Sequence, residues 1–369
     1  MASFATQKSA VNIFEPPVKV AGEIKKFKIG YTESTEYANY AATFYNVLLG
    51  LKELGWIETL EGIPYKPGQN EATAMWQWLC INQPSIYIEF VSDAFYKFDG
   101  DQTVMAAAYK RTHEKAQGID LMLTFGTLAG KTLTKTTPEI PVLVFSTSNA
   151  LASEIIASAT DSGKDNVWAH IDPKRYQKQV TVMHDIFKFK KLGIIYEDTV
   201  EGRSYADLKN VKEVCASLGI QLVERHVTEN VTPKEYPRYK KDMSAAFVDL
   251  SDEVDAFYLT AGNLNPSDLP ELFKPFYTKK IPVISQLGGE EVEKGAVMST
   301  ASNFIDLGRY GAQIVIQSLK GKNPRKLECL YEDVPYIVLN LNVANKIGYK
   351  PEFEILLIAD KVYFNPKSK

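Results

Sequence analysis

The sequence predicts an α/β protein built from two doubly wound parallel-sheet lobes, and three observations carry this prediction. Short apolar runs alternate with segments of helical periodicity, the alternation occurs twice, and the chain has 369 residues. That length exceeds one domain of about 150 residues. Strands separated by helices form parallel sheets with right-handed crossovers and helices on both faces. We therefore expect two similar lobes joined by several crossings of the chain.

In the first half, the expected elements follow in strand–helix order after a polar N-terminal segment. Residues 1–24 lack periodicity and contain Pro16-Pro17, which predicts a mobile arm. Apolar residues then recur at helical spacing from Tyr37 to Leu51, and Gly55 ends this helix. Strands are expected at 27–31, 86–91, 119–125 and 140–145, with further helices at 102–115 and 128–135.

The second half repeats this pattern with the same residue types in the same order. A lysine pair precedes the first strand of each half, an aspartate opens a later strand, and Ile-Pro-Val opens the next one. The repeated positions are Lys25-Lys26 and Lys190-Lys191, Asp120 and Asp255, and Ile140 and Ile281. The shared order favours a pair of like lobes over two unrelated domains.

The remaining elements are too few for a third domain, so we expect them to complete the two sheets. They are strands at 296–299 and 336–341, a helix at 305–319 and a helical tail. The expected division is an arm at 1–24, lobe one at 25–147 plus 299–332, lobe two at 148–298 plus 333–345, and a C-terminal helical tail at 346–369. Three crossings between the lobes predict a hinge.

Charge and composition argue against several function classes. Forty-two basic and 45 acidic residues leave a net charge of −3, so we expect no nucleic-acid partner. Three scattered cysteines and four scattered histidines show no metal-ligand spacing, and we expect no metal or cofactor. The loop 126–130 has three residues between its glycines where a phosphate loop needs four, which argues against nucleotide hydrolysis. The Glu290-Glu291 pair is expected on a solvated face.

The candidate site lies where strands end, because ligands of open parallel sheets bind beyond the carboxyl ends of the strands. The expected ligand-binding residues are mostly small polar ones: Thr32, Glu33, Ser34, Tyr37, Gly126, Thr127, Leu128, Ser146, Thr147 and Asn303 in lobe one, and Glu197, Ser204, Thr260, Asn263 and Gln286 in lobe two. Ser34, Ser148 and Ser204 are open to a second interpretation, as helix caps.

Five segments give the chain a resemblance to the substrate-binding proteins of a branch of bacterial ABC importers. They occur in the same order from about Lys28 to Tyr363: 50–55 (GLKELG), 124–129 (TFGTLA), 191–196 (KLGIIY), 295–296 (GA) with 307–309 (LGR), and 339–348 (LNLNVANKIG) with 359–360 (AD). The resemblance implies the type I periplasmic-binding-protein fold, no enzymatic activity, a permease partner and a periplasmic or extracellular location after removal of a signal segment. We expect a monomer.

Some members of this branch bind amino acids, often aromatic ones, which implies ligand contacts at Thr127, Ser146, Ser204 and Asn263. Two acidic residues of the family pattern are missing here. The family has an acidic residue beside the asparagine where this chain has Gly262-Asn263, and it has Asp-Tyr where this chain has Asn303-Phe304. Glu33 or Glu197 is a possible substitute partner for an ammonium group, and a carboxylic acid without an ammonium group is the other possibility. An extracellular sensor domain and a doubly wound enzyme are the alternative functions.

Overall fold

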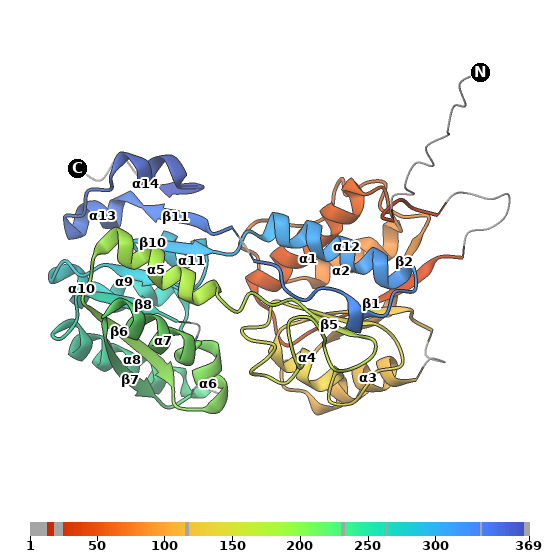
Figure 1. The fold of residues 1–369 in the computed structure, drawn as a ribbon, viewed down its shortest axis with the longest axis horizontal. Helices are drawn as coiled ribbons and strands as arrows, with labels where there is room; N and C mark the ends of the chain where they lie inside the picture. The colour runs from red at the N-terminus through yellow and green to blue at the C-terminus, as the bar shows by residue number, and fades with distance from the viewer. Residues whose placement is uncertain are drawn as a thin grey trace, which may run out of the picture. The chain divides into compact units, whose positions relative to one another are not determined.

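The computed structural model describes residues 13–17, 25–114, 118–229, 233–260, 262, 264–332 and 334–364. The chain forms two compact α/β units, which Figure 1 shows coloured along the sequence. The first unit comprises residues up to Ile171 together with Phe304–Tyr331, and the second comprises Asp172–Asn303 together with the residues from Glu332 onward. Each unit has its own apolar core. The expected fold class is confirmed.

A five-stranded, fully parallel sheet in the order β2-β1-β3-β4-β5 forms the centre of the first unit. Its strands are β1 (Phe27–Glu33), β2 (Ile88–Lys97), β3 (Leu121–Phe125), β4 (Val142–Phe145) and β5 (Val167–Ala169). Its helices are α1 (Ala38–Glu53), α2 (Thr73–Asn82), α3 (Gln102–His113), α4 (Thr127–Leu133) and α12 (Phe304–Leu319), with a short 3₁₀ turn at Pro324–Lys326. The strands β3 and β4 are wholly buried, as expected for a parallel sheet covered on both faces.

The second unit contains a seven-stranded sheet in the order β12-β11-β10-β9-β8-β6-β7. Among the described strands of this sheet, β10 and β11 pair antiparallel and the other neighbours pair parallel. The strands are β6 (Lys191–Glu197), β7 (Gln221–Val227), β8 (Ala256–Leu259), β9 (Val283–Ser285), β10 (Met298–Ala301), β11 (Tyr336–Asn340) and β12 (Lys361–Tyr363). The helices are α5 (Arg175–Phe187), α6 (Val200–Tyr205), α7 (Leu208–Leu218), α8 (Tyr236–Ser251), α9 (Leu269–Leu272), α10 (Lys274–Thr278), α11 (Gly289–Lys294), α13 (Leu341–Ile347) and α14 (Phe353–Ile358).

The internal repeat of the sequence corresponds to a repeat of topology. Strands β7-β6-β8-β9-β10 follow the same order as β2-β1-β3-β4-β5. The repeated aspartates have the same role: Asp120 Oδ2 accepts from the backbone N–H of Lys28 at 2.7 Å, and Asp255 Oδ2 accepts from that of Lys191 at 3.1 Å. Each carboxylate therefore satisfies a backbone donor at the start of the first strand of its unit.

Several expected boundaries are wrong. Strand β2 begins two residues late and continues to Lys97, and the residues that pair with β1 shift between Ile29 and Tyr31. The first division between the units falls between Ile171 and Asp172, whereas the sequence placed it between 147 and 148, because the three-residue strand β5 joins the first sheet. So short a strand, after a long irregular segment, leaves no periodicity to recognise.

The C-terminal segment is not a separate helical tail. Only α14 and the end of α13 are helical after residue 346, and β12 joins the second sheet beside β11. Most of the expected N-terminal arm lies outside the described residues. Its described part, residues 13–17, contacts the first unit, since the Trp56 Nε1–H donates to the Phe14 carbonyl at 2.8 Å. None of the described helices is long and apolar enough to cross a bilayer.

Helix α12 returns to the first unit and packs closely on α1. A Cβ atom added at Gly308 would lie 2.4 Å from the Asn46 backbone, so the helices meet at backbone distance. At the edge of this contact, the Arg309 guanidinium donates two hydrogen bonds to the Glu53 carboxylate, at 2.8 and 3.0 Å. The glycine at 308 thus explains how residues after the second sheet are held in the first unit.

Candidate functional site

The predicted residues of the first unit lie at three neighbouring strand ends. Glu33 ends β1, Gly126 follows β3, and Ser146 follows β4. Backbone hydrogen bonds link these ends, from the Ser34 N–H to the Phe125 carbonyl at 3.0 Å and from the Gly126 N–H to the Phe145 carbonyl at 2.9 Å. Because the strands are parallel, all three ends lie at the same edge of the sheet.

Ser34 caps a helix, but not the one that follows it in the chain. Its Oγ accepts from the Ala129 N–H in the first turn of α4 at 2.9 Å. The residue that precedes α4, Gly126, has no side chain to cap the helix, and any Cβ there would lie 2.6 Å from Ser34 Oγ. With φ of +91°, this position also needs glycine for its backbone. The helix-cap interpretation of Ser34 therefore holds.

Replacing Ser34 with alanine is expected to lower the free energy of unfolding of the first unit by about 1 kcal/mol, because the Ala129 N–H loses its acceptor. Urea unfolding followed by tryptophan fluorescence measures this change. Thr32→Val is the matched control, since among the described residues its hydroxyl donates to the sulfur of Met122, a weak acceptor. A loss for Ser34→Ala no larger than that for Thr32→Val would contradict the cap.

The segment after β4 combines a strained backbone with a buried hydroxyl. Ser146 has φ of +53°, in the left-handed region that residues other than glycine rarely adopt, and its Oγ lies 3.0 Å from Thr43 Oγ1. Thr147 is 8% exposed, and its Oγ1 has no hydrogen-bond partner among the described residues. Strain and unpaired polar atoms are both enriched at functional sites.

Glu33 is a fully buried carboxyl group. The Tyr31 hydroxyl donates to its Oε2 at 2.7 Å, whereas its Oε1 has no partner in the described part of the chain. Burial raises the pKa of Glu33 to about 7, more than the bond from Tyr31 lowers it. Tyr31 in turn packs between the rings of Phe95 and Phe125. Glu33 is therefore packed beneath the strand end and is not exposed at its surface.

The second unit repeats the arrangement at the ends of β6, β8 and β9. Glu197 ends β6, Thr260 follows β8, and Gln286 follows β9. The Thr260 Oγ1–H donates to the Ile195 carbonyl at 2.8 Å, and the Gln286 N–H donates to the Leu259 carbonyl at 2.8 Å. The strand ends that the sequence predicted are thus linked within this unit too.

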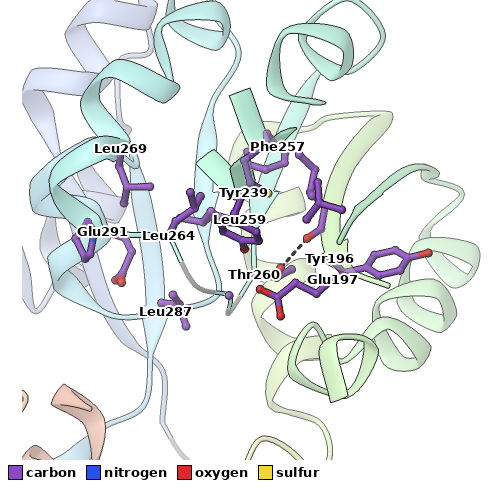
Figure 2. A pocket seen from close by; sticks show the side chains of 15 residues that line it. Tyr196, Glu197, Tyr239, Phe257, Leu259, Thr260, Leu264, Leu269, Leu287 and Glu291 are labelled. Atoms are coloured by element: carbon purple, nitrogen blue, oxygen red, sulfur yellow. Dashed lines mark hydrogen bonds between the residues drawn. The ribbon is translucent and has the colours of Figure 1, made fainter. Parts of the chain in front are cut away.

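A pocket opens at these strand ends, within the second unit (Figure 2). Its walls are mostly apolar and come from the sheet, from α8 and from the segment 264–269. The polar side chains among them include Glu197, Thr260 and Glu291, and Figure 2 shows the two carboxyl groups on opposite sides of the apolar residues. An apolar pocket with a few polar groups is the usual form of a small-molecule site.

Glu291 corrects the expectation that the Glu290-Glu291 pair is solvated. Glu290 is exposed, but Glu291 lines the pocket, and burial raises its pKa to about 7. Its carboxyl group also accepts from the backbone N–H groups of Gly288 and Glu291 at the start of α11. The sequence signal was the position of Glu291 at the third residue of a helix, where glutamate reaches back to the first turn.

Ser204 does not cap a helix. It lies inside α6, whose cap is Thr199, since Thr199 Oγ1 accepts from the Gly202 N–H at 2.9 Å. The Ser204 Oγ is buried and has no partner among the described residues. The second interpretation offered for Ser204 is therefore wrong, and the hydroxyl is left without a structural role.

The other predicted residues have varied positions. Tyr37 is the residue before α1, Thr127 and the partly exposed Leu128 begin α4, and Asn303 ends the second unit just before α12. Asn263 lies outside the described residues. Sequence reasoning missed Tyr239 and Met243, which line the pocket from α8, because helix periodicity alone marks them as core residues. No three histidine, cysteine or acidic side chains in the described part of the chain are placed to hold a metal ion.

Comparison with known proteins decides the family. A family model described as ABC transporter substrate binding protein matches residues 91–363. The chain belongs to the ABC transporter substrate-binding protein family. The resemblance drawn from the sequence is thereby confirmed. This is a family of solute-binding proteins rather than of enzymes, and its members act outside the cytoplasm.

Individual relatives of this substrate-binding protein are distant in sequence. A tyrosine-binding protein of Clostridioides difficile is 22% identical over 268 residues, 69% of this chain and 73% of the relative. Two solved structures each match with a TM-score of 0.65, over 92% of this chain and 100% of the matched chain. One is an ABC domain in complex with L-Trp from Streptococcus pneumonia, which is 20% identical. The other is the ligand-free, open structure of a substrate-binding protein with adhesive properties from Clostridium difficile, which is 21% identical. These similarities establish the shared fold.

Proposed function

We propose that this protein binds an aromatic amino acid for an ABC importer, closing its two units over the ligand by hinge motion. The observation that carries the proposal is a pair of buried hydroxyl groups, Thr147 Oγ1 in the first unit and Ser204 Oγ in the second, with no partner among the described residues. Buried polar atoms are almost always hydrogen-bonded, so unpaired ones just after β4 and within α6, the helix that follows β6, support a binding site for a polar ligand.

The pocket of the second unit supports the aromatic part of the proposal. Its lining includes Tyr239, Phe257 and Leu264, which suit an apolar ring. The relative that binds tyrosine and the structure containing L-Trp support the same ligand class.

Glu197 is the acid that we assign to the ligand's ammonium group, in place of the two family acids that are missing beside Asn263 and at Asn303. Glu197 is 4% exposed and lines the pocket. Its Oε1 lies beside Gly262, which also lines the pocket, at 4.0 Å from the position that a Cβ atom on Gly262 would occupy. A charged ligand group inside a buried site needs an opposite charge to offset desolvation. Glu33 is less suitable because it is wholly buried beneath the strand end.

Closure requires that the ligand favour one state over the other. To shift the protein from about 1% to about 99% closed, the ligand must bind the closed state more favourably than the open state by about 5.5 kcal/mol of binding free energy. Charge-assisted hydrogen bonds and ring packing supply energies of this order. Small-angle scattering should therefore report a smaller radius of gyration when ligand is added.

Calorimetric titration with tyrosine, tryptophan and phenylalanine, and with the same molecules lacking the amino group, tests the proposal. We expect the amino acids to bind about tenfold or more tightly than their deaminated forms, because Glu197 then pairs with the ammonium group. Glu197→Gln should remove most of this difference, and the exposed neighbour of the pocket, Glu290→Gln, should leave it intact. Tighter binding of the deaminated acids would instead favour a carboxylate ligand without an ammonium group.

Delivery to a permease is tested separately, by uptake of the labelled ligand into host cells with and without the gene. We expect uptake at low ligand concentration to require the protein. Intact uptake in its absence, with binding preserved in vitro, would favour the sensor function.

A further inference from the structure

Glu291 is a carboxyl group of the pocket that has no role in the function proposed above. It lines the pocket from α11, together with the apolar side chains of Leu264, Leu269 and Leu287. Helix α11 packs against α9 and against the 3₁₀ turn Pro266–Asp268, which belong to the same wall. No basic side chain in the described part of the chain forms an ion pair with Glu291. An acid among apolar side chains, without a cation, costs free energy unless hydrogen bonds satisfy it.

Hydrogen bonds hold the Glu291 residue in place. Its carboxyl group accepts from the backbone N–H of Gly288, and its backbone carbonyl accepts from the Ala296 N–H at 2.8 Å. The next residue, Val292, is wholly buried, and its carbonyl accepts from Asn340 Nδ2 at 2.6 Å. A group that is already fixed loses little conformational freedom when a ligand binds, so it can discriminate between similar ligands.

The chemistry of the Glu291 carboxyl group indicates a hydroxyl as its ligand partner. A carboxylate has about four acceptor positions, so the backbone N–H groups of Gly288 and Glu291 leave some of them open. Burial raises the pKa of Glu291 to about 7, which disfavours a full negative charge at neutral pH. A second cation would therefore gain little here and would lose its hydration. A hydroxyl donates to the ionised carboxylate and accepts from the neutral acid, so it suits both forms.

The pocket separates Glu291 from Glu197. Both residues line it, and Figure 2 shows their carboxyl groups on opposite sides of the apolar side chains. This arrangement suits a molecule with an ammonium group at one end, a hydroxyl at the other end and an aromatic ring between them.

We propose that Glu291 selects the ligand by forming a hydrogen bond with a hydroxyl group on its aromatic ring, so that the protein prefers a phenolic amino acid such as tyrosine to phenylalanine. This inference rests on the proposed function, in which Glu197 binds the ammonium group. Phenylalanine would leave the Glu291 carboxyl group without a ligand partner after the ring has excluded water from it. A site that hydrogen-bonds a ligand hydroxyl rejects the analogue without one for this reason.

Calorimetric titration of the full chain with tyrosine and with phenylalanine tests the proposal. We expect the wild type to bind tyrosine about tenfold or more tightly than phenylalanine. Glu291→Leu should reduce this ratio to about one, because leucine offers no hydrogen bond. Glu291→Gln should keep most of the preference, since its amide both donates and accepts. The ratio of the two affinities is the readout, because a merely structural loss weakens the binding of both ligands alike.

Glu290→Leu is the matched control. Glu290 is the exposed neighbour of Glu291 in the first turn of α11, so its replacement should leave the ratio unchanged. Circular dichroism checks that each variant folds. Glu291→Met, which keeps an unbranched side chain, takes the place of Glu291→Leu if that variant does not fold.

The outcomes separate this inference from the proposed function. A wild type that binds tyrosine and phenylalanine equally, and both more tightly than their deaminated forms, overturns the role of Glu291 and leaves the proposed function standing. A tyrosine preference that Glu291→Leu leaves intact also overturns it, because another group then recognises the hydroxyl. Tighter binding of tryptophan than of tyrosine would overturn the hydroxyl as the selected group. Failure to bind any aromatic amino acid would overturn the proposed function, and this inference with it.

Discussion

Gly308→Ala is expected to lower the free energy of unfolding of the first unit by about 2 to 3 kcal/mol. Alanine is the better helix former, and in an uncrowded helix interior the same change stabilises by about 1 kcal/mol. The two effects have opposite signs, so the direction of the change shows which one prevails at this position.

The crowding at Gly308 comes from backbone rather than from a flexible side chain. A Cβ there would lie 2.4 Å from both the backbone carbon and the Cβ of Asn46, so α1 and α12 have to separate. Gly50, on the α1 side of the same contact, faces the Cβ of Ala312 at 2.8 Å. Separation opens packing along both helices, since protein interiors have little free volume to absorb the shift.

Tryptophan fluorescence during urea unfolding measures this change selectively, because all four tryptophans of the chain lie in the first unit: Trp56, Trp76, Trp78 and Trp168. Gln313→Ala is the control on the same helix, where the side chain is partly exposed, and we expect a change below about 0.5 kcal/mol. If Gly308→Ala raised the urea midpoint, the close helix contact would be wrong.

Glu33→Gln is expected to stabilise the first unit at alkaline pH and to remove much of its pH dependence. Burial raises the pKa of Glu33 from 4.5 to about 7, so the folded state favours the neutral carboxyl group. The associated stability is fully present below the unfolded pKa and is lost as the pH rises through about 7. A shift of this size corresponds to about 3 kcal/mol lost between about pH 5 and about pH 8.

Urea unfolding at a series of pH values, again read by tryptophan fluorescence, checks this prediction. Glutamine keeps an acceptor for the Tyr31 hydroxyl and does not ionise, so the variant should be the more stable protein at pH 8 by about 2 to 3 kcal/mol. Glu291 also has a raised pKa, but it lies in the second unit, which has no tryptophan. The exposed Glu58→Gln is the control and should behave like the wild type. A wild-type stability that rises between pH 5 and pH 8 would contradict a buried, neutral Glu33.

Much of the fold follows from local patterns. Buried parallel strands are continuous apolar runs, so β3 and β4 were found within two residues of their starts. Asp120 and Asp255 occupy equivalent positions in the two halves of the sequence. Each carboxylate accepts a hydrogen bond from a backbone N–H at the start of the first strand of its unit, so the shared structural role explains the repeated residue type. Strands β5 and β12 were missed because each has three residues, which are too few to show a periodicity.

The sequence also predicted one part of the candidate site, the strand ends, but not the partners of the polar groups at those ends. The strand ends were predictable, since a parallel sheet places all its carboxyl ends at one edge. The partners of the polar groups there were not, because Ser34 caps a helix that begins more than 90 residues later and Ser204 caps none. Glu291 was assigned to solvent because it was interpreted as one of two adjacent acids in a charged segment, and not as the third residue of a helix.

By itself, the sequence determined the two α/β units, their repeat and the family, because apolar periodicity and short ordered segments are properties of neighbouring residues. Only the tertiary structure decided which polar atoms are paired, which acids are buried and which apolar side chains remain uncovered. Those properties depend on residues brought together from distant parts of the chain, as Gly308 meets Asn46 and the Ala129 N–H meets Ser34 Oγ. A hydrogen bond or a raised pKa is a property of that local environment, and no spacing along the chain encodes it.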